Sequence, residues 1–441
     1  MRGQPQHEGE RPALAGGVRQ VAGPEHPAGA EPARGTVRLL LDRTVGPYFA
    51  AKVLASMGIW IHNVVAAIVV YQVSGSALLV GAVSIAQFTP QVFLAPWMGA
   101  VADRGDRCGQ VVAGRLGTAA GSGALAVWIA VIGLEGPRGA AAVIAAALVV
   151  GIGFAVSGPA MHALEPALAR PSELPVVITI ATSPFTVARA AGPALGALLL
   201  VIAGPAVAFG VASSCQLAFA FVVWRLRLRS VVRPESSDGS VLAGVRYLRR
   251  DAAVALLLIG VTGVGFGVDP VITLSPPLAA GYGAGAELVA AMASAFGAGA
   301  AVTVFLLGPV RRRFSQSRIG SAGLGVLAAS MAAVAASPTS ALAVAFLFVG
   351  GMGMMGAITS LTTQIQQRVP EELRGRVMAL WSVCFVGSRP LAAAINGAIA
   401  DLWSPEAALV VLAALLAAAA ILARPSRIAR AALSPLHTWR P

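Results

Sequence analysis

The chain has 441 residues, of which 57% are hydrophobic and only 12% are charged. A soluble domain carries about 25% charged residues because water must wet its surface, so the composition excludes an ordinary soluble protein. The net charge of +13 comes from 31 arginines and one lysine. These cations lie at helix ends and in alternate loops, which is the pattern of a membrane protein and argues against a nucleic-acid partner.

The first 45 residues mix Arg, Glu, Pro and Gly without an apolar core. Such a composition is typical of a disordered tail, and it does not fit a cleavable signal peptide. Three arginines precede the first apolar stretch, at Arg34, Arg38 and Arg43. We therefore expect residues 1–45 to form a disordered tail in the cytoplasm.

Twelve apolar stretches follow, and each is long enough to cross a bilayer core of about 30 Å as a helix. They span 46–71, 78–101, 110–133, 140–164, 174–203, 206–225, 252–279, 286–309, 319–336, 340–364, 376–401 and 406–423. The longest connection divides them six and six. We therefore predict an N-terminal bundle at 46–225, a basic cytoplasmic linker at 226–251, a C-terminal bundle at 252–423 and a cytoplasmic tail at 424–441.

The connections alternate in charge along the chain. Basic residues fill every second connection, whereas the connections on the other side hold only Arg138. Cytoplasmic loops are the ones enriched in Lys and Arg. The sequence therefore predicts a multi-pass protein of the cytoplasmic (inner) membrane with both termini in the cytoplasm.

The two halves share a weak internal repeat. Residues 170–174 read Arg-Pro-Ser-Glu-Leu, and residues 368–373 read Arg-Val-Pro-Glu-Glu-Leu. A mid-span arginine follows each repeat, Arg189 in the first half and Arg389 in the second. Related halves of this kind form a binding site at their interface in many transporters.

The connection between the second and third stretches resembles the signature loop of the major facilitator superfamily, Gly-x-x-x-Asp-Arg-x-Gly-Arg-Arg/Lys. The matching residues are Gly99, Asp103, Arg104 and Arg107, whereas Asp106 and Cys108 differ. In the family this loop is thought to hold the cytoplasmic side in one conformation, so the resemblance implies a conformational switch at Asp103. The alternative is that Asp103 only orients the loop.

Residues 367–380 resemble one branch of that superfamily, which includes the enterobactin exporter and proteins described as macrolide efflux. The resemblance implies an all-α membrane protein with twelve transmembrane helices in two pseudo-symmetric bundles, the major facilitator fold. It implies a secondary transporter that acts as a monomer, needs no cofactor or metal, and exports a small molecule such as a siderophore, drug or secondary metabolite, with protons as the exchanged ion.

The fifth stretch contains Gly192-Pro193-x-x-Gly196, which is similar to the core of the family's antiporter motif. Proline kinks a helix, and glycine allows two helices to approach closely. The motif favours export over import. Ala188 stands where the full motif has a further glycine, so import of a small metabolite remains an alternative.

Several polar residues within the stretches are candidates for contact with substrate, because polar groups deep in a membrane face a cavity or a partner. The candidates are Arg189, Thr186, Arg389, Asn396, His62, Asn63 and Gln87. Two arginines in a central cavity would favour an anionic substrate. Each residue could instead form a structural pair, as a hydrogen-bonded core pair does for His62 and Asn63.

Three residues are candidates for proton coupling: Asp269, Glu165 and His162. A carboxylate in an apolar environment binds a proton more readily than one in water. A salt bridge between Asp269 and Arg389 is an equally good interpretation of Asp269. His162 and Glu165 lie three residues apart on a predicted helix, and an ion pair at the helix end explains them as well as a proton relay does.

A polytopic membrane enzyme is the alternative class of function. Against it, the sequence has no His-x-x-x-His, Glu-x-x-His or paired-acid motif on a common helix. It also lacks the Gly-x-x-x-x-Gly-Lys-Ser/Thr loop of a nucleotide-driven pump. Without these motifs we expect no enzyme activity. The three cysteines match neither a disulfide framework nor metal-ligand spacing, so we expect no metal site.

Overall fold

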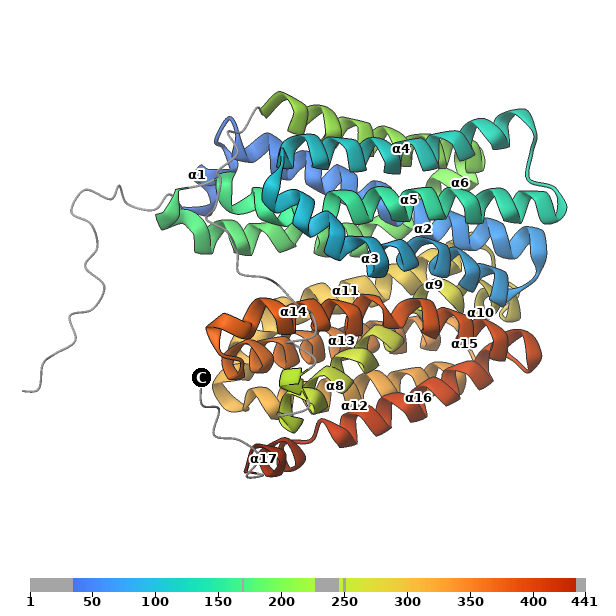
Figure 1. The fold of residues 1–441 in the computed structure, drawn as a ribbon. Coiled ribbons are helices and arrows are strands. Elements are labelled where there is room, and N and C mark those ends of the chain that lie inside the picture. Colours follow the sequence, from blue (N-terminus) through green and yellow to red (C-terminus); the bar gives the residue numbers. More distant parts are fainter. Residues whose placement is uncertain (1–34, 169, 227–245, 249–250, 434–441) are drawn as a thin grey trace, which may run out of the picture.

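The computed structural model describes residues 35–168, 170–226, 246–248 and 251–433. All regular elements in these ranges are helices. The long helices run along one common direction and form two bundles, one from α2 to α6 and one from α8 to α16 (Figure 1). The predicted linker at 226–251 lies mostly outside the described residues.

The first bundle contains helices that agree closely with the first six predicted stretches. They are α2 (Val45–Ser74), α3 (Ala77–Arg104), α4 (Arg107–Val131), α5 (Gly136–Leu164) and α6 (Leu174–Leu226), with two 3-10 turns, η1 (Glu165–Leu168) and η2 (Pro171–Glu173), before α6. Helix α6 is broken at Gly204, whose φ of 79° lies in the left-handed region that favours glycine. The break falls between the two stretches predicted at 174–203 and 206–225.

The second bundle contains α8 (Ala252–Val268), α9 (Pro270–Thr273), α10 (Ser275–Gly281), α11 (Ala286–Arg313), α12 (Gln316–Ala335), α13 (Ser340–Arg368), α14 (Glu371–Val386), α15 (Ser388–Leu402) and α16 (Pro405–Leu422). Two stretches predicted as single spans are interrupted. The stretch at 252–279 divides near Pro270 and Pro276, because proline cannot donate the helical hydrogen bond. The stretch at 376–401 divides at Gly387 into α14 and α15.

Ten helical segments among the described residues are long and apolar enough to cross a membrane. Their outer faces carry large exposed apolar side chains, such as Phe305 at 82% and Val201 at 66% exposure. Lipid, rather than water, is the solvent that such faces require. The chain is therefore an all-α multi-pass membrane protein. The predicted number of twelve spans requires α6 to count as two and α4 to be included, and it stays a prediction.

The disordered tail predicted at 1–45 is too long at its inner boundary. Residues 36–40 form a short helix, α1 (Thr36–Leu40), whose Leu39 is fully buried against the start of α2. Residues 425–433 form α17 (Pro425–Leu433), whose Ile428 is 8% exposed and packs on the second bundle. Burial of Leu39 and Ile428 against the bundles stabilises these two short helices.

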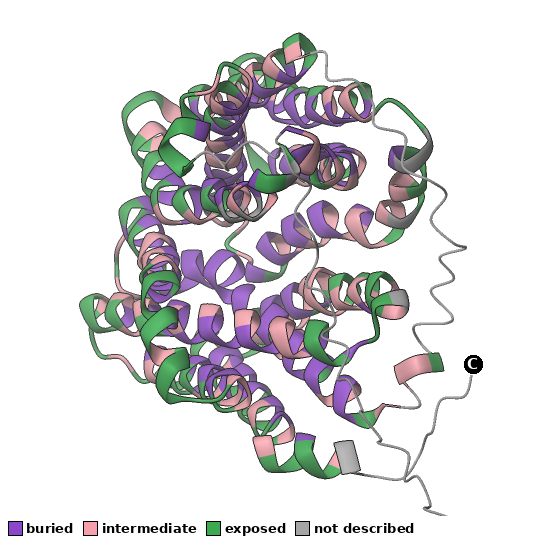
Figure 2. Ribbon diagram, turned by 90° about the vertical axis from the view of Figure 1, so that its left-hand side faces the viewer, coloured by how far each residue is buried: buried purple, intermediate pink, exposed green. Residues whose placement is uncertain are grey.

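We call the end of the molecule that carries α1 and α17 the terminal end, and the opposite end the distal end (Figure 1). Buried residues lie on the inner faces of the helices of both bundles, and exposed residues lie at the periphery (Figure 2). The two bundles meet chiefly where α6 packs on α11 and where α3 packs on α15. This interface positions the polar residues described next.

Candidate functional site

Arg189 extends from α6 into the interface between the bundles. Its guanidinium carbon lies 5.5 Å from the ring centroids of both Trp60 and Phe296, and its Nη1 lies 3.9 Å from the Sδ atom of Met354. The side chain is buried, and its Nε–H group has no hydrogen-bond partner among the described residues. Phe296 and Met354 belong to the second bundle, so Arg189 reaches across the interface.

Arg389 reaches across the interface in the opposite direction. It lies on α15, and its guanidinium carbon is 3.7 Å from the ring centroid of Phe88 on α3. Its Nε and Nη2 atoms are buried, and no hydrogen-bond partner for them lies in the part of the chain that the structure describes. Arg189 and Arg389 lie close enough for their charges to repel each other.

Two buried guanidinium groups with unpaired N–H donors are energetically costly. A cation–π contact stabilises a buried cation by about 2 kcal/mol, whereas an Arg at the centre of a membrane helix costs about 3 kcal/mol even on the lowest scale. The aromatic faces stabilise the positive charges, but among the described residues they leave Nε of Arg189 and Nε and Nη2 of Arg389 without a hydrogen-bond acceptor. A carboxylate, phosphate or sulfonate group could accept hydrogen bonds from these donors and neutralise part of the charge.

Asp269 lies between α8 and α9 and is fully buried. Its carboxylate accepts hydrogen bonds from Asn396 Nδ2 at 2.9 Å and Thr273 Oγ1 at 3.0 Å. Among the described residues it forms no direct ion pair with Arg389, although the two charges attract each other through space. The structure thus brings three predicted candidates together: Asp269, Asn396 and Arg389.

The remaining cavity candidates are dispersed. Thr186 is half-buried one turn from Arg189 on α6, and Gln87 is buried where α3 packs on α5. His62 lies inside the first bundle, where its Nδ1 atom is 3.0 Å from Ser122 Oγ. Asn63 is buried, and its Oδ1 atom accepts no hydrogen bond within the described ranges. His62 therefore fits the alternative of a hydrogen-bonded pair in the core, although its partner is Ser122 rather than Asn63.

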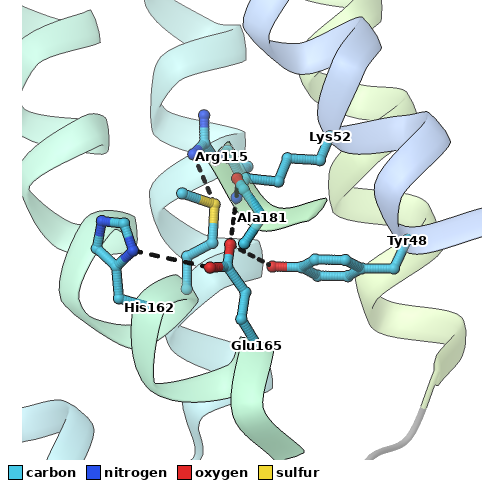
Figure 3. A network of polar contacts seen from close by, with 7 residues as sticks. Tyr48, Lys52, Arg115, His162, Glu165 and Ala181 are labelled. Carbon is cyan, nitrogen blue, oxygen red and sulfur yellow. Dashed lines mark hydrogen bonds and ion pairs between the residues drawn. The ribbon is translucent and has the colours of Figure 1, made fainter. Parts of the chain in front are cut away.

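Glu165 belongs to a second polar cluster, near the terminal end of the first bundle (Figure 3). It forms a buried ion pair with Lys52 of α2 and accepts a 3.5 Å hydrogen bond from the Tyr48 hydroxyl. Lys52 Nζ also donates to the Ala181 carbonyl of α6 at 2.8 Å. His162 lies 3.9 Å from Glu165, but its side chain is 75% exposed. The cluster therefore links α2, α5 and α6.

Arg115 lies beside this cluster and is also buried (Figure 3). It donates to Gln216 Oε1 at 3.1 Å and contacts Met161 Sδ at 3.3 Å. Neither Lys52 nor Arg115 is among the site residues predicted from the sequence. Two features of the sequence could have identified them. Lys52 is the one lysine of the chain, and Arg115 interrupts the apolar stretch at 110–133.

The predicted switch loop connects α3 and α4. Arg107 donates from Nε to the Ala102 carbonyl at 3.1 Å, which ties the start of α4 to the end of α3. A Cβ atom on Gly99 would have no neighbour within 4 Å. The side chains of Asp103 and Arg104 lie outside the described residues, so the role of Asp103 stays a prediction.

The antiporter-like motif brings α6 close to α2. A Cβ atom on Gly192 would lie 2.5 Å from the Cβ atom of Trp60, and one on Gly196 would lie 3.2 Å from the Cα atom of Ile61. Pro193 is buried between the two glycines. This close approach places Trp60 against Arg189 and so shapes the interface site.

A cavity of about 290 Å³ lies at the distal end, between α2, α10 and α11. Its lining includes Tyr71, Gln72 and Val289, and it contains none of the predicted site residues. Within the ranges that the structure describes, no three His, Cys, Asp or Glu side chains gather as a metal site requires.

The sequence profile of the family described as transmembrane secretion effector matches residues 42–440. The chain belongs to this family. Transmembrane secretion effectors have the major facilitator fold, and the solved structures similar to this chain are transporters of that fold. Among curated protein sequences no match was found.

Three solved structures illustrate the similarity. A point mutant of the nucleoside transporter NupG is 12% identical with a TM-score of 0.69, over 86% of this chain and 98% of that chain. A bacterial homologue of the iron transporter ferroportin, in an inward-facing state, is 14% identical with a TM-score of 0.68, over 90% and 99% of the two chains. A D-xylose–proton symporter is 11% identical with a TM-score of 0.68, over 86% and 97%. At these identities the similarity establishes only the fold of this member of the secretion effector family.

Proposed function

We propose that this transporter exports a small molecule with an acidic group across the cytoplasmic membrane, by alternating access and in exchange for protons. The observation that carries the proposal is the pair Arg189 and Arg389. Each crosses from its own bundle to the other, and each keeps buried nitrogen donors that no described residue accepts a hydrogen bond from. A ligand bound by both would be released when the bundles separate.

The charge of the interface supports an acidic substrate. Arg189 and Arg389 supply two positive charges, and Asp269 supplies one negative charge that is already hydrogen-bonded to Asn396 and Thr273. One positive charge is therefore left for an incoming anion to neutralise. Trp60, Phe296 and Phe88 flank the two guanidinium groups, so the substrate would carry aromatic or apolar groups beside its acid.

Three considerations support export. Gly192-Pro193-x-x-Gly196 is similar to the antiporter motif, and the matched family is described as a secretion effector. The third is energetic, because a membrane potential of about 100 mV, negative inside, favours the outward movement of one negative charge by roughly 2.3 kcal/mol. An importer of the same anion would have to work against this potential.

The proton-coupling candidates differ in how their protonation would change the binding of an anionic substrate. A proton on Asp269 removes the negative charge that attracts Arg389, so it strengthens the binding of an anionic substrate. Antiport requires the opposite, namely that proton and substrate exclude each other. Glu165 lies outside the arginine pair, where its ion pair with Lys52 is linked to α6 through the Ala181 carbonyl, so a proton there would not strengthen anion binding in this way. We therefore assign the exchanged proton to Glu165.

The test of function is a comparison of metabolites in cells with and without the protein. Cells that express it should retain less of a set of compounds inside and release more of them, and those compounds should carry carboxylate, phosphate or sulfonate groups. The variant R189Q/R389Q is the control, and it should behave like cells without the protein. Release of neutral or cationic compounds alone, or release that the double variant leaves unchanged, would refute the proposal.

A further inference from the structure

Asp401, near the end of α15, contacts the first turn of α3 in the opposite bundle. Its carboxylate accepts hydrogen bonds from Ser76 Oγ at 2.5 Å, from the Ala77 backbone N–H at 2.7 Å and from the Leu78 backbone N–H at 3.2 Å. We call this set of hydrogen bonds the distal contact. It joins residues that are more than 300 positions apart in the sequence.

Helix electrostatics explain why this contact is favourable. The first turn of a helix has backbone N–H groups without helical partners and a partial positive charge, and both attract a carboxylate. For its own helix, Asp401 has the wrong charge, because the C-terminal end of a helix disfavours an acid. The position of Asp401 is thus explained by the contact with α3 rather than by the stability of α15.

Helix packing shows that α3 and α15 are closed at this end. A Cβ atom on Gly81 would lie 2.6 Å from the Ala393 carbonyl oxygen, and one on Gly397 would lie 2.7 Å from the Leu78 Cα atom. Towards the terminal end, Cβ atoms on Gly99 of α3 and Gly375 of α14 would meet no described neighbour within 4 Å. The described conformation is therefore tightly packed at the distal end of this helix pair, whereas these two glycines near the terminal end face open space.

The sequence contains the same motif at the ends of both helices. Residues 99–103, at the end of α3, read Gly-Ala-Val-Ala-Asp, and residues 397–401, at the end of α15, read Gly-Ala-Ile-Ala-Asp. The first copy belongs to the predicted switch loop. The second copy supplies Asp401 to the distal contact, so the two aspartates lie at opposite ends of one helix pair.

We propose that Asp401 is a switch residue of the distal gate, and that it acts in alternation with Asp103. The distal contact stabilises the conformation that is closed at the distal end. When the bundles rock to the other conformation, the distal contact breaks. Asp103 then forms the equivalent contact at the terminal end, with the first turn of α14. This inference rests on the alternating access proposed above.

The experiment measures the separation of the bundles directly. Spin labels at Arg138 and Thr339, both exposed at the distal end of the two bundles, report distance distributions in a background where Cys108, Cys215 and Cys384 are replaced by serine. D401A should raise the ratio of distal-open to distal-closed molecules about fivefold, which is the effect of losing one helix-capping carboxylate. D103A should lower this ratio.

The matched control is E287A. Glu287 is also an acid at a helix N-terminus at the distal end, but its carboxylate accepts from the Gly285 N–H of its own helix at 3.2 Å. E287A should leave the distances unchanged. The milder variant D401N keeps an acceptor oxygen and loses the charge, so it should give a smaller shift and covers the case in which D401A does not fold.

Distances in D401A and D401N that equal those of the unsubstituted protein would overturn the inference. This result is independent of transport, because the distances are measured without substrate. If the unsubstituted protein releases no acidic compound but D401A still opens the distal end, the proposed function fails and the gate stands. If transport is intact and D401A opens nothing, the gate fails and the proposed function stands.

Discussion

At the scale of single residues, two buried cations of this protein are balanced in different ways. Lys52 has a carboxylate partner in Glu165, a hydroxyl neighbour in Tyr48 and a carbonyl acceptor in Ala181. Arg189 has aromatic faces and a thioether, but its Nε–H group has no partner. The first arrangement satisfies a charge and stabilises the bundle. The second leaves a donor available, which is what a binding site requires.

We predict that K52M destabilises the protein strongly, because it leaves Glu165 as a buried, unpaired charge, and the loss of one partner of a buried ion pair costs about 3–5 kcal/mol. The double variant K52M/E165Q should recover much of this loss. Thermal unfolding of the detergent-solubilised protein, followed by tryptophan fluorescence, measures both. A double variant that is less stable than K52M would show that the pair is not the source of the effect.

Arg189 should respond in the opposite way. R189Q removes an incompletely paired charge, so we expect equal or higher thermal stability together with a loss of at least tenfold in export, equivalent to about 1.4 kcal/mol of binding. R389Q should reduce export to a similar degree, and R389K should retain part of it because lysine keeps the charge but not the planar donor geometry. Unchanged export in both glutamine variants would end the assignment of the arginine pair.

The pH dependence of binding tests Asp269. Since protonation of Asp269 frees Arg389, the unsubstituted protein should bind its anionic substrate more tightly as the pH falls through the range in which Asp269 takes up a proton. D269N is permanently neutral there, so its binding should be tight and nearly independent of pH over the same range. Tryptophan quenching by the identified substrate provides the measurement. A D269N variant that keeps the full pH dependence would exclude Asp269 as its source.

At the scale of helices, the position of the arginine site depends on how closely α6 approaches α2. Gly192 makes this approach possible, because the space that its Cβ atom would occupy is taken by Trp60. Trp60 in turn lies against the Arg189 guanidinium. A change in the spacing of two helices would therefore be transmitted to the site through one tryptophan.

We predict that G192A separates α6 from α2 and lowers both export and thermal stability. The matched control is G210A on the second part of α6, where an added Cβ atom would meet nothing within 4 Å. There the substitution should stabilise the helix by up to about 1 kcal/mol, because alanine is the better helix former. Export assays and thermal unfolding of the two variants give the comparison, and equal behaviour of both would contradict the packing argument.

Helix positions could be predicted from the sequence more fully than contacts could. Hydropathy located the break in α6, because the polar and turn-forming residues that end a span are neighbours in the sequence. It could not identify the Lys52–Glu165 ion pair or the contact of Asp401 with α3, since these partners are 113 and more than 300 positions apart. It also overestimated the disordered N-terminal tail, because one buried side chain such as Leu39 has little weight in an average over many residues.

At the scale of the whole molecule, basic residues are concentrated at the terminal end. Arg311, Arg312 and Arg313 end α11 there, whereas Arg138 lies at the distal end. Cytoplasmic ends carry the excess of arginine in membrane proteins. We therefore expect the terminal end, with both described termini, to face the cytoplasm.

Single cysteines test this orientation in the background without native cysteines. A cysteine at Arg138 should react with a membrane-impermeant maleimide in intact cells, and one at Ser315, between α11 and α12, should react only after the membrane is opened. A cysteine at Thr339 serves as a second distal position and should behave like the one at Arg138. Labelling of position 315 in intact cells would reverse the orientation and, with it, the direction of transport.

The single lysine of the chain has a practical consequence. Amine-reactive reagents have one side chain to modify, and that side chain is enclosed between α2, α5 and α6 by Glu165 and the Ala181 carbonyl. Modification at Lys52 thus requires these three helices to loosen. The rate of acylation at Lys52 would therefore report how often the first bundle opens locally. A ligand that slows this acylation could be identified as a binder without a transport assay.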